Sequence, residues 1–215
     1  TLKLLYGRAF RSPTVFELYY DVPPSTVSNH SLQPERIETY ELVYEHDFGR
    51  GLRATASHYS YSIRNLITQI YDPSSGSPSF KNQERAEAEG TEVEAQKTWQ
   101  NGADCRISYA YQRSVDPRTG EQLTNAPNHI AKLNLIVPIV QERFFTGIEE
   151  QYLGPRITVA GRRTEGFAVT NLTLFGRVPQ RSVEASISIY NVLDMKYADP
   201  VSGDLVPLET VQQAG

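Results

Sequence analysis

The chain has 215 residues, enough for one all-β domain or for a large part of a bigger one. Its 21 basic and 25 acidic residues give a net charge of −4, which argues against a nucleic-acid partner. The single cysteine, Cys105, excludes an internal disulfide framework and a cysteine-based metal site. No apolar run reaches the roughly 18 residues of a transmembrane helix, and a mean hydropathy of −0.44 is compatible with alternating barrel strands.

Nine runs have the composition of β-strands, and no helical pattern of any length is found. At about 3.3 Å per residue, the run 80–99 would span roughly 65 Å, which is unusually long for a small soluble sandwich. The nine predicted strands are 1–7, 36–47, 52–71, 80–99, 103–115, 129–138, 142–154, 167–177 and 182–192.

Several of these runs alternate polar and apolar residues with a period of two, which predicts strands with one apolar and one wet face. In the fifth run, the residues Cys105, Ile107, Tyr109 and Tyr111 point to one side and polar residues point to the other. A lipid-facing side should leave these four residues without a second protein layer, whereas a soluble sandwich would pack them against another sheet.

Two irregularities are expected in the long strands. In 52–63 the apolar set shifts by one residue between Ala56 and Tyr59, which predicts a β-bulge. Gly90 precedes a cleanly alternating segment and would also permit a bulge.

The connections alternate between short and long along the chain. An outer-membrane barrel has short periplasmic turns and long extracellular loops, whereas a sandwich has no reason to place every tight turn at one end. The pattern predicts an all-β, antiparallel transmembrane β-barrel fragment, with a soluble β-rich binding or adhesion module as the alternative. The short connections are 48–51, 100–102, 138–141 and 178–181, and the long ones are 8–35, 72–79, 116–128, 155–166 and 193 onward.

Four stretches, spread over nearly the whole chain, resemble motifs of the TonB-dependent outer-membrane receptors. They follow the order of the family's motifs, from a strand end and loop, through two strand starts, to a segment near the C-terminus. The stretches are YGRAFRSPTVFELYY (6–20), LQPERIETYELVYE (32–45), EGTEVEAQ (89–96) and ISIYNVLDMKYADPVSG (187–203).

The resemblance implies that residues 1–215 are the C-terminal portion of a receptor barrel, about nine of the last ten strands of a 22-stranded barrel. The plug that fills such barrels, the first half of the barrel and the last strand are expected to be absent from this chain. Residues 211–215 are expected to lie where the last strand begins. Because an open half-barrel has two unpaired edges, we expect that this segment alone does not form a closed pore.

The resemblance further implies a receptor in the bacterial outer membrane that captures a scarce nutrient with its extracellular loops and imports it with energy coupled through TonB. A ferric siderophore is the expected cargo, and haem or cobalamin is the alternative. The implied partners are the TonB complex, contacted through an absent N-terminal region, the small ligand and outer-membrane lipid. No cofactor is expected, and neither is an enzyme, because the sequence shows no GxSxG motif, phosphate-binding loop or nucleophile–base set.

The first long connection holds the candidate ligand residues, because loops at the open end of such a barrel carry the binding function. Cations and aromatic rings suit flat, anionic iron complexes through charge and stacking, and the alternative is that Arg8 and Arg11 pair with carboxylates of the lumen. His30 is a weak haem-ligand candidate, since it lies inside the box NHSL (29–32) and not between it and the box FRSP (10–13) as in haem receptors. The candidates are Arg8, Arg11, Tyr19, Tyr20 and His30.

Overall fold

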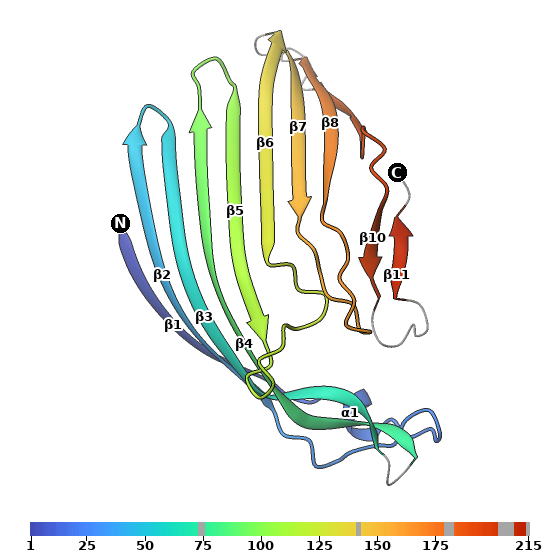
Figure 1. The fold of residues 1–215 in the computed structure, drawn as a ribbon. Coiled ribbons are helices and arrows are strands. Elements are labelled where there is room, and N and C mark those ends of the chain that lie inside the picture. The colour runs from blue at the N-terminus through green and yellow to red at the C-terminus, as the bar shows by residue number, and fades with distance from the viewer. Residues whose placement is uncertain (73–75, 141–142, 179–182, 202–208, 214–215) are drawn as a thin grey trace.

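Each of the nine predicted runs corresponds to a strand in the computed structural model (Figure 1). The strands are β1 (Leu2–Arg11), β2 (Glu35–Gly49), β3 (Leu52–Asp72), β4 (Ser77–Thr98), β5 (Asp104–Val115), β6 (His129–Val140), β7 (Phe144–Leu153), β8 (Phe167–Val178) and β9 (Val183–Ile189). The structure describes residues 1–72, 76–140, 143–178, 183–201 and 209–213.

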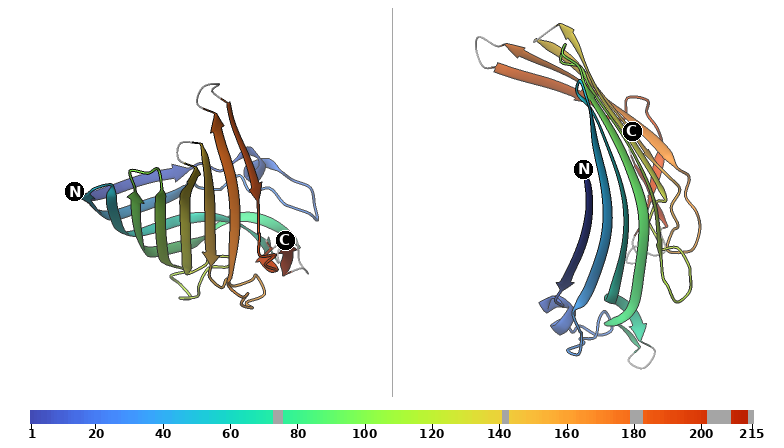
Figure 2. Two further views of the ribbon diagram at one scale, coloured as in Figure 1. Left: turned by 90° about the horizontal axis from the view of Figure 1, so that it is seen from above. Right: turned by 90° about the vertical axis from the view of Figure 1, so that its left-hand side faces the viewer.

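Within these residues the nine strands form one sheet, in which each strand pairs antiparallel with the next strand along the chain. Such an up-and-down order needs only local connections. The sheet is a curved, twisted wall that does not close on itself, because β1 pairs only with β2 and β9 only with β8 (Figure 2). The predicted antiparallel barrel fold is therefore confirmed, as an open section of barrel wall.

The two faces of this wall differ in chemistry. One face, called the outer face below, is apolar along its middle, and its side chains are exposed. Ile107, Tyr109 and Tyr111 are 54%, 41% and 42% exposed, so they do not pack against a second layer. The ladders place Leu42, Val93, Ile107, Leu133, Leu174 and Ile187 on the outer face, and Ser57, Glu92, Glu94, Arg106, Lys132 and Asn134 on the opposite, inner face.

The bulge predicted within 52–63 is wrong. The ladders of β3 with β2 and β4 run without a register shift up to Ile63, and the irregularity lies between Ile63 and Leu66, where Asn65 has a φ of 58°. The apolar set changes phase because Ala56 lies on the outer face and Tyr59 on the inner face. The change of phase therefore does not mark an extra residue in the strand.

The bulge expected at Gly90 is also absent, since Gly90 pairs regularly with both Tyr59 and Gln112. The glycine instead makes room for an aromatic ring on the inner face. A Cβ at Gly90 would stand 2.5 Å from the hydroxyl oxygen of Tyr59.

The connections sort to two ends of the wall, called the turn end and the loop end. At the turn end, the β2–β3 turn is tight, with Arg50 and Gly51 at φ of 53° and 75°, as left-handed hairpin turns require. The predicted turns at 138–141 and 178–181 fall largely in strand residues or outside the described residues. At the loop end, the predicted long connection 72–79 is wrong, because β3 and β4 themselves extend to Asp72 and from Ser77 (Figure 1).

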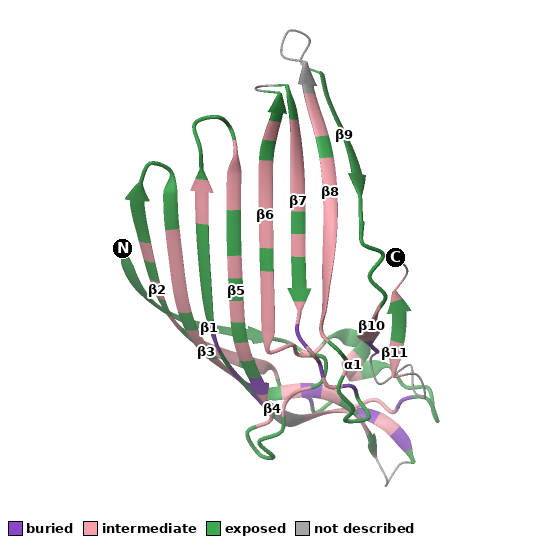
Figure 3. Cartoon of the chain, turned by 45° about the horizontal axis from the view of Figure 1, so that its top comes forward, coloured by how far each residue is buried: buried purple, intermediate pink, exposed green. Residues whose placement is uncertain are grey.

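Buried side chains gather at the loop end, around the far part of the β3–β4 hairpin, where Leu32 and Ile67 are 7% and 8% exposed (Figure 3). Two elements there were not expected from the sequence: a short helix, α1 (Val15–Tyr19), and a two-stranded sheet of β10 (Tyr197–Pro200) and β11 (Thr210–Gln213). Among the described residues, no helix has the length and apolar character needed to cross a membrane.

Candidate functional site

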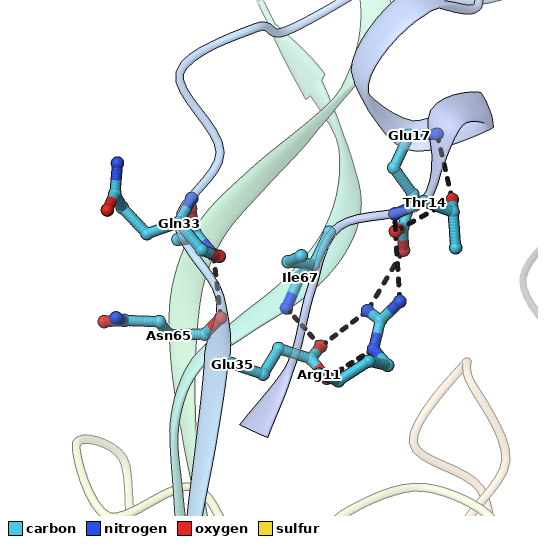
Figure 4. A network of polar contacts seen from close by, with 8 residues as sticks. Arg11, Thr14, Glu17, Gln33, Glu35, Asn65 and Ile67 are labelled. Atoms are coloured by element: carbon cyan, nitrogen blue, oxygen red, sulfur yellow. Dashed lines mark hydrogen bonds and ion pairs between the residues drawn. The ribbon is translucent and has the colours of Figure 1, made fainter.

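Arg11 lies at the loop end of β1 and is the centre of a network of charged groups (Figure 4). Its guanidinium donates to both carboxylate oxygens of Glu35 at 2.6 and 2.8 Å and to both oxygens of Glu17 at 3.0 Å. Glu35 in turn accepts the backbone N–H of Ile67 at 2.8 Å. Planar guanidinium groups favour such two-pronged contacts with carboxylates, so Arg11 ties together the strands β1, β2 and β3 and the helix α1.

The helix α1 is fixed by a capping box. The Thr14 hydroxyl accepts the backbone N–H of Glu17 at 3.2 Å, and the Glu17 carboxylate accepts the backbone N–H of Thr14 at 2.7 Å. Burial by itself raises the pKa of Glu17, but the hydrogen bonds from Arg11 and Thr14 outweigh it and hold the pKa below its usual value. Glu17 is therefore a carboxylate at neutral pH, as its two roles require.

The segment between α1 and β2 is held against the β3–β4 hairpin mainly by amide side chains. Asn82 accepts the backbone N–H of Gln33 at 2.7 Å and donates to the carbonyl oxygens of Gln33 and Asn65, both at 2.8 Å. Asn29 donates to the carbonyl oxygen of Phe80 at 2.8 Å, and Val27 forms a parallel bridge with Ser79. These contacts fix the segment to the hairpin at Val27, Asn29 and Gln33.

Several aromatic rings lie on α1 and on the segment between α1 and β2. Tyr19 and His30 are in ring contact at 4.9 Å, and the Tyr19 side chain is 60% exposed. Tyr20 stacks on Phe16 at 4.4 Å, and Phe16 meets Phe80 edge to face at 5.9 Å. The structure therefore brings Tyr19, Tyr20 and His30 onto one short segment, anchored to the hairpin through Phe80.

The two arginines of the predicted site do not join them in the loop. Both lie in β1, which extends to Arg11, so the predicted loop 8–35 begins four residues too early. Arg8 forms an ion pair with Glu38 at 2.9 Å and faces away from Arg11, because the two residues are three positions apart on one strand. β1 extends through both arginines because each forms an ion pair with a carboxylate on β2.

A second cluster joins three other segments of the loop end. Arg156, whose side chain is 7% exposed, donates to Asp199 at 2.5 Å and to Asn125 at 3.2 Å. Its guanidinium lies over the ring of Phe167, which stacks on Tyr197 at 4.1 Å. The connection after β7 is thereby linked to the connection after β5 and to β10.

An ion pair on the rim strengthens the same region. Arg162 donates to both oxygens of Glu209, and the Glu209 carboxylate also accepts the Thr158 hydroxyl at 3.4 Å. The hydrogen bonds from Arg162 hold the pKa of Glu209 below its usual value. Glu209 precedes β11, so this pair fastens the two-stranded sheet to the connection after β7.

Sequence reasoning missed the carboxylates that engage the arginines, Glu17, Glu35 and Glu38, and it missed Arg156. A local signal existed for Glu17, because Thr14 followed three residues later by Glu17 is the pattern of a capping box. No local signal exists for Glu35 or Arg156, whose partners are distant in sequence. Among the described residues, no three His, Cys, Asp or Glu side chains are grouped so that they could hold a metal ion.

Comparison with known protein families shows to which family the chain belongs. The family "TonB dependent receptor-like, beta-barrel" matches residues 1–192. The chain belongs to the TonB-dependent receptor family. The resemblance seen in the sequence motifs is thereby confirmed. No curated protein sequence matches the chain.

Solved structures of TonB-dependent receptors share the fold. The copper transporter OprC is 22% identical, with a TM-score of 0.78 over 100% of this chain and 35% of its own. The ferric-catecholate import receptor Fiu from E. coli K12 is 18% identical, with a TM-score of 0.73 over 99% of this chain and 31% of its own. A mutant of the ferric enterobactin receptor PfeA from Pseudomonas aeruginosa is 17% identical, with a TM-score of 0.75 over 91% and 33%. The chain thus spans about a third of the length of these structures.

Proposed function

We propose that this chain is part of the barrel wall of an outer-membrane receptor that imports a scarce nutrient with TonB-coupled energy. The supporting observation is the spacing of aromatic residues on the outer face. Tyr40 and Phe48 on β2 are eight residues apart, as are Phe144 and Tyr152 on β7. Eight residues at about 3.3 Å, tilted by about 40°, span about 20 Å along the barrel axis, close to the apolar band of about 25 Å between the aromatic girdles of membrane barrels.

The side chains between these aromatic residues agree with a lipid boundary. Leu42, Val93, Ile107 and Leu174 lie on the outer face and are 45%, 45%, 54% and 45% exposed. Large aliphatic side chains left open over several adjacent strands cost free energy in water and none in hydrocarbon. In this orientation the loop end is extracellular and the turn end is periplasmic.

We further propose that residues 1–215 are the C-terminal portion of a 22-stranded barrel that encloses a plug and contacts TonB through an N-terminal region. The open edges of β1 and β9 support this, because exposed strand edges within a membrane require pairing partners. Mass and sequence of the intact protein from cells test this arrangement. A mature protein of little more than 24.2 kDa would refute it.

The proposed cargo is a ferric siderophore, bound at the loop end by the exposed rings of Tyr19, Tyr20 and His30. Support comes from the stacking surface of these rings and from the structural neighbours, which include a ferric-catecholate receptor and a ferric enterobactin receptor. Arg8 and Arg11 belong to the site as residues that hold the end of β1, since carboxylates engage both.

The decisive experiment measures uptake by the full-length receptor in a strain that lacks its other siderophore receptors. Cells should accumulate ⁵⁵Fe from at least one ferric siderophore, and the accumulation should stop when TonB is removed. Haem, cobalamin and copper serve as parallel cargoes. Uptake of haem, cobalamin or copper instead would support the proposed import function and contradict the proposed siderophore cargo. Retention of the receptor in a soluble fraction would contradict both proposals.

Variants of the aromatic residues test the site. Tyr19→Ala and His30→Ala should weaken ligand binding by about fivefold or more, since each stacked ring contributes about 1 kcal/mol or more. Val15→Ala is the matched control, because Val15 lies on the same helix, is 75% exposed and has no ring partner among the described residues. If all three variants bound the ligand with equal affinity, the proposal that these rings contact the ligand would be wrong.

A further inference from the structure

Three arginines form a row across adjacent strands on the outer face, beyond Tyr40 and level with the exposed ring of Phe10, which is directly opposite Arg36. Arg36 on β2 is directly opposite Arg64 on β3, and Arg85 on β4 lies beside the irregularity that follows Ile63. All three are exposed. Arg36 is paired on both sides, with Phe10 and Arg64, whereas Arg85 lies beyond the last residue pair of β4 and β5, Glu87 with Val115. We call Arg36, Arg64 and Arg85 the arginine row.

The guanidinium groups of the row have no ion-pair partner among the described residues, although Glu38 and Glu87 lie on the same face, two residues from Arg36 and Arg85. No ion pair or hydrogen bond joins any of its guanidinium groups to a carboxylate, whereas nearby Arg8 is paired with Glu38 at 2.9 Å. Glu87 lies on the same face two residues along β4 from Arg85, yet it forms no ion pair with the row. Like charges placed directly opposite on a sheet destabilise it, so this arrangement favours an external anion.

The position of the row points to the source of that anion. Arg36 is four residues beyond Tyr40 on β2, about 13 Å along the strand and about 10 Å along the barrel axis at a tilt of about 40°. That height is just outside the hydrocarbon, in the headgroup layer. Arginine forks bind phosphate oxygens in pairs, and clusters of basic residues at this level recognise phosphorylated lipid headgroups.

We propose that the arginine row binds the phosphate groups of the glycolipid in the outer leaflet, lipopolysaccharide. The inference rests on the proposed membrane orientation but is independent of the imported cargo. The site lies on the lipid side of the wall, opposite the inner face, and its occupant is a membrane component that the receptor contacts permanently. Binding there would offset the repulsion between Arg36 and Arg64 and fasten the base of the β3–β4 hairpin to the membrane surface.

The test uses the full-length receptor in detergent and a fluorescent, deeply truncated lipopolysaccharide. Replacing Arg36, Arg64 and Arg85 together by Gln should lower the affinity by about tenfold or more, because several charge-assisted hydrogen bonds are lost. The control variant replaces Arg53 and Arg106 by Gln, since both lie on the inner face. The control should bind within about twofold of the wild type, and a triple Lys variant should fall between wild type and the triple Gln variant.

Two further arms identify the anion. Lipopolysaccharide stripped of its phosphates should bind the wild type as weakly as the intact glycolipid binds the triple Gln variant. Inorganic phosphate should compete only at concentrations far above those of the lipid, and equal competition would overturn the lipid assignment. Heat-modifiable migration on gels verifies that each variant contains a folded barrel.

The remaining outcomes separate this inference from the proposed function. Unchanged lipopolysaccharide affinity in a triple Gln variant that still resides in the outer membrane and imports its cargo overturns the arginine row alone. A receptor found outside the outer membrane overturns the proposed function. If the wild type is a dimer, the triple Gln variant is a monomer and glycolipid binding is unchanged, the row is an interface between copies and the proposal fails.

Discussion

The phenol ring of Tyr59 lies across Gly90 on the inner face of the sheet. A Cβ at Gly90 would stand 2.5 Å from the Tyr59 hydroxyl oxygen, 2.6 Å from its Cζ and 2.8 Å from the carbonyl oxygen of Tyr111. The ring is held there by a hydrogen bond from its hydroxyl group to Gln112 at 3.2 Å. The glycine is therefore required by the ring that covers it, an arrangement that pins the register of β3 against β4.

Gly90→Ala should destabilise the barrel by about 1–3 kcal/mol, because backbone and ring must both move to admit the methyl group. Gly147→Ala is the matched control. Gly147 is also an inner-face strand glycine, but its nearest atom would be 3.8 Å away. Heat-modifiable gel migration of the full-length receptor measures both. Equal unfolding temperatures for the two variants would contradict the close approach.

Acidification should release α1 from the end of β1. The pKa of Glu17 is held below its usual value, so its contribution to the folded state is present above about pH 4.5 and is lost as the pH falls through the lowered pKa. A nitroxide on Val15→Cys, in a Cys105→Ser background, reports this by electron paramagnetic resonance. Its spectrum should sharpen as the pH falls below the usual pKa of a glutamate side chain.

Glu17→Gln provides the control for the acid transition, because it removes the charge that Arg11 recognises and keeps the size of the side chain. The label should already be mobile at pH 7 in this variant, with little further change in acid. A label that is equally immobile at pH 7 in both proteins would show that the Arg11 contact does not hold the helix.

Arg156→Ala should loosen three connections at once. The side chain is almost fully buried and joins Asn125 to Asp199, so its loss removes both hydrogen bonds and costs about 1–3 kcal/mol. Proteinase K should cut the connection after β7 faster than in the wild type. Arg163→Ala, an exposed change in the same connection, should leave the cutting rate unaltered. Identical rates for the two variants would show that the connections are held by other contacts.

Glu150 offers a test of which face meets lipid. It lies on the outer face, opposite Leu133, and accepts the hydroxyl of Thr170, whereas neighbouring Glu149 lies on the inner face. In lipid vesicles, Glu150→Leu should stabilise the full-length barrel by about 1 kcal/mol, because a carboxylate facing hydrocarbon is unfavourable. Glu149→Leu should be neutral or destabilising in the same urea titration. If Glu149→Leu stabilised the barrel and Glu150→Leu did not, the inner face and not the outer face would be the one that meets lipid.

The face assignment was accessible from sequence at strands such as β5, where alternation persists through the membrane-height segment. It failed at β3. There the ring of Tyr59 turns to the inner face, while His58 and Ser60 take the outer face, level with Leu42 and Tyr40. When the apolar residues of a strand move from one face to the other, the strand either contains an extra residue at a bulge or stays regular while its surroundings change. Only the pairing with neighbouring strands distinguishes these two cases.

The sequence by itself determined the strands, their antiparallel order and the alternation of apolar and polar faces, because these depend on residues two apart and on local turns. Only the tertiary structure decided the ends of β1, the partners of Arg11 and the meeting of Arg36 with Arg64. Arg11 meets Glu35 across 24 residues of chain, and Arg156 meets Asp199 across 43. Contacts at such separations are fixed by the register of the strands and by the packing of the loops against them, which no local pattern encodes.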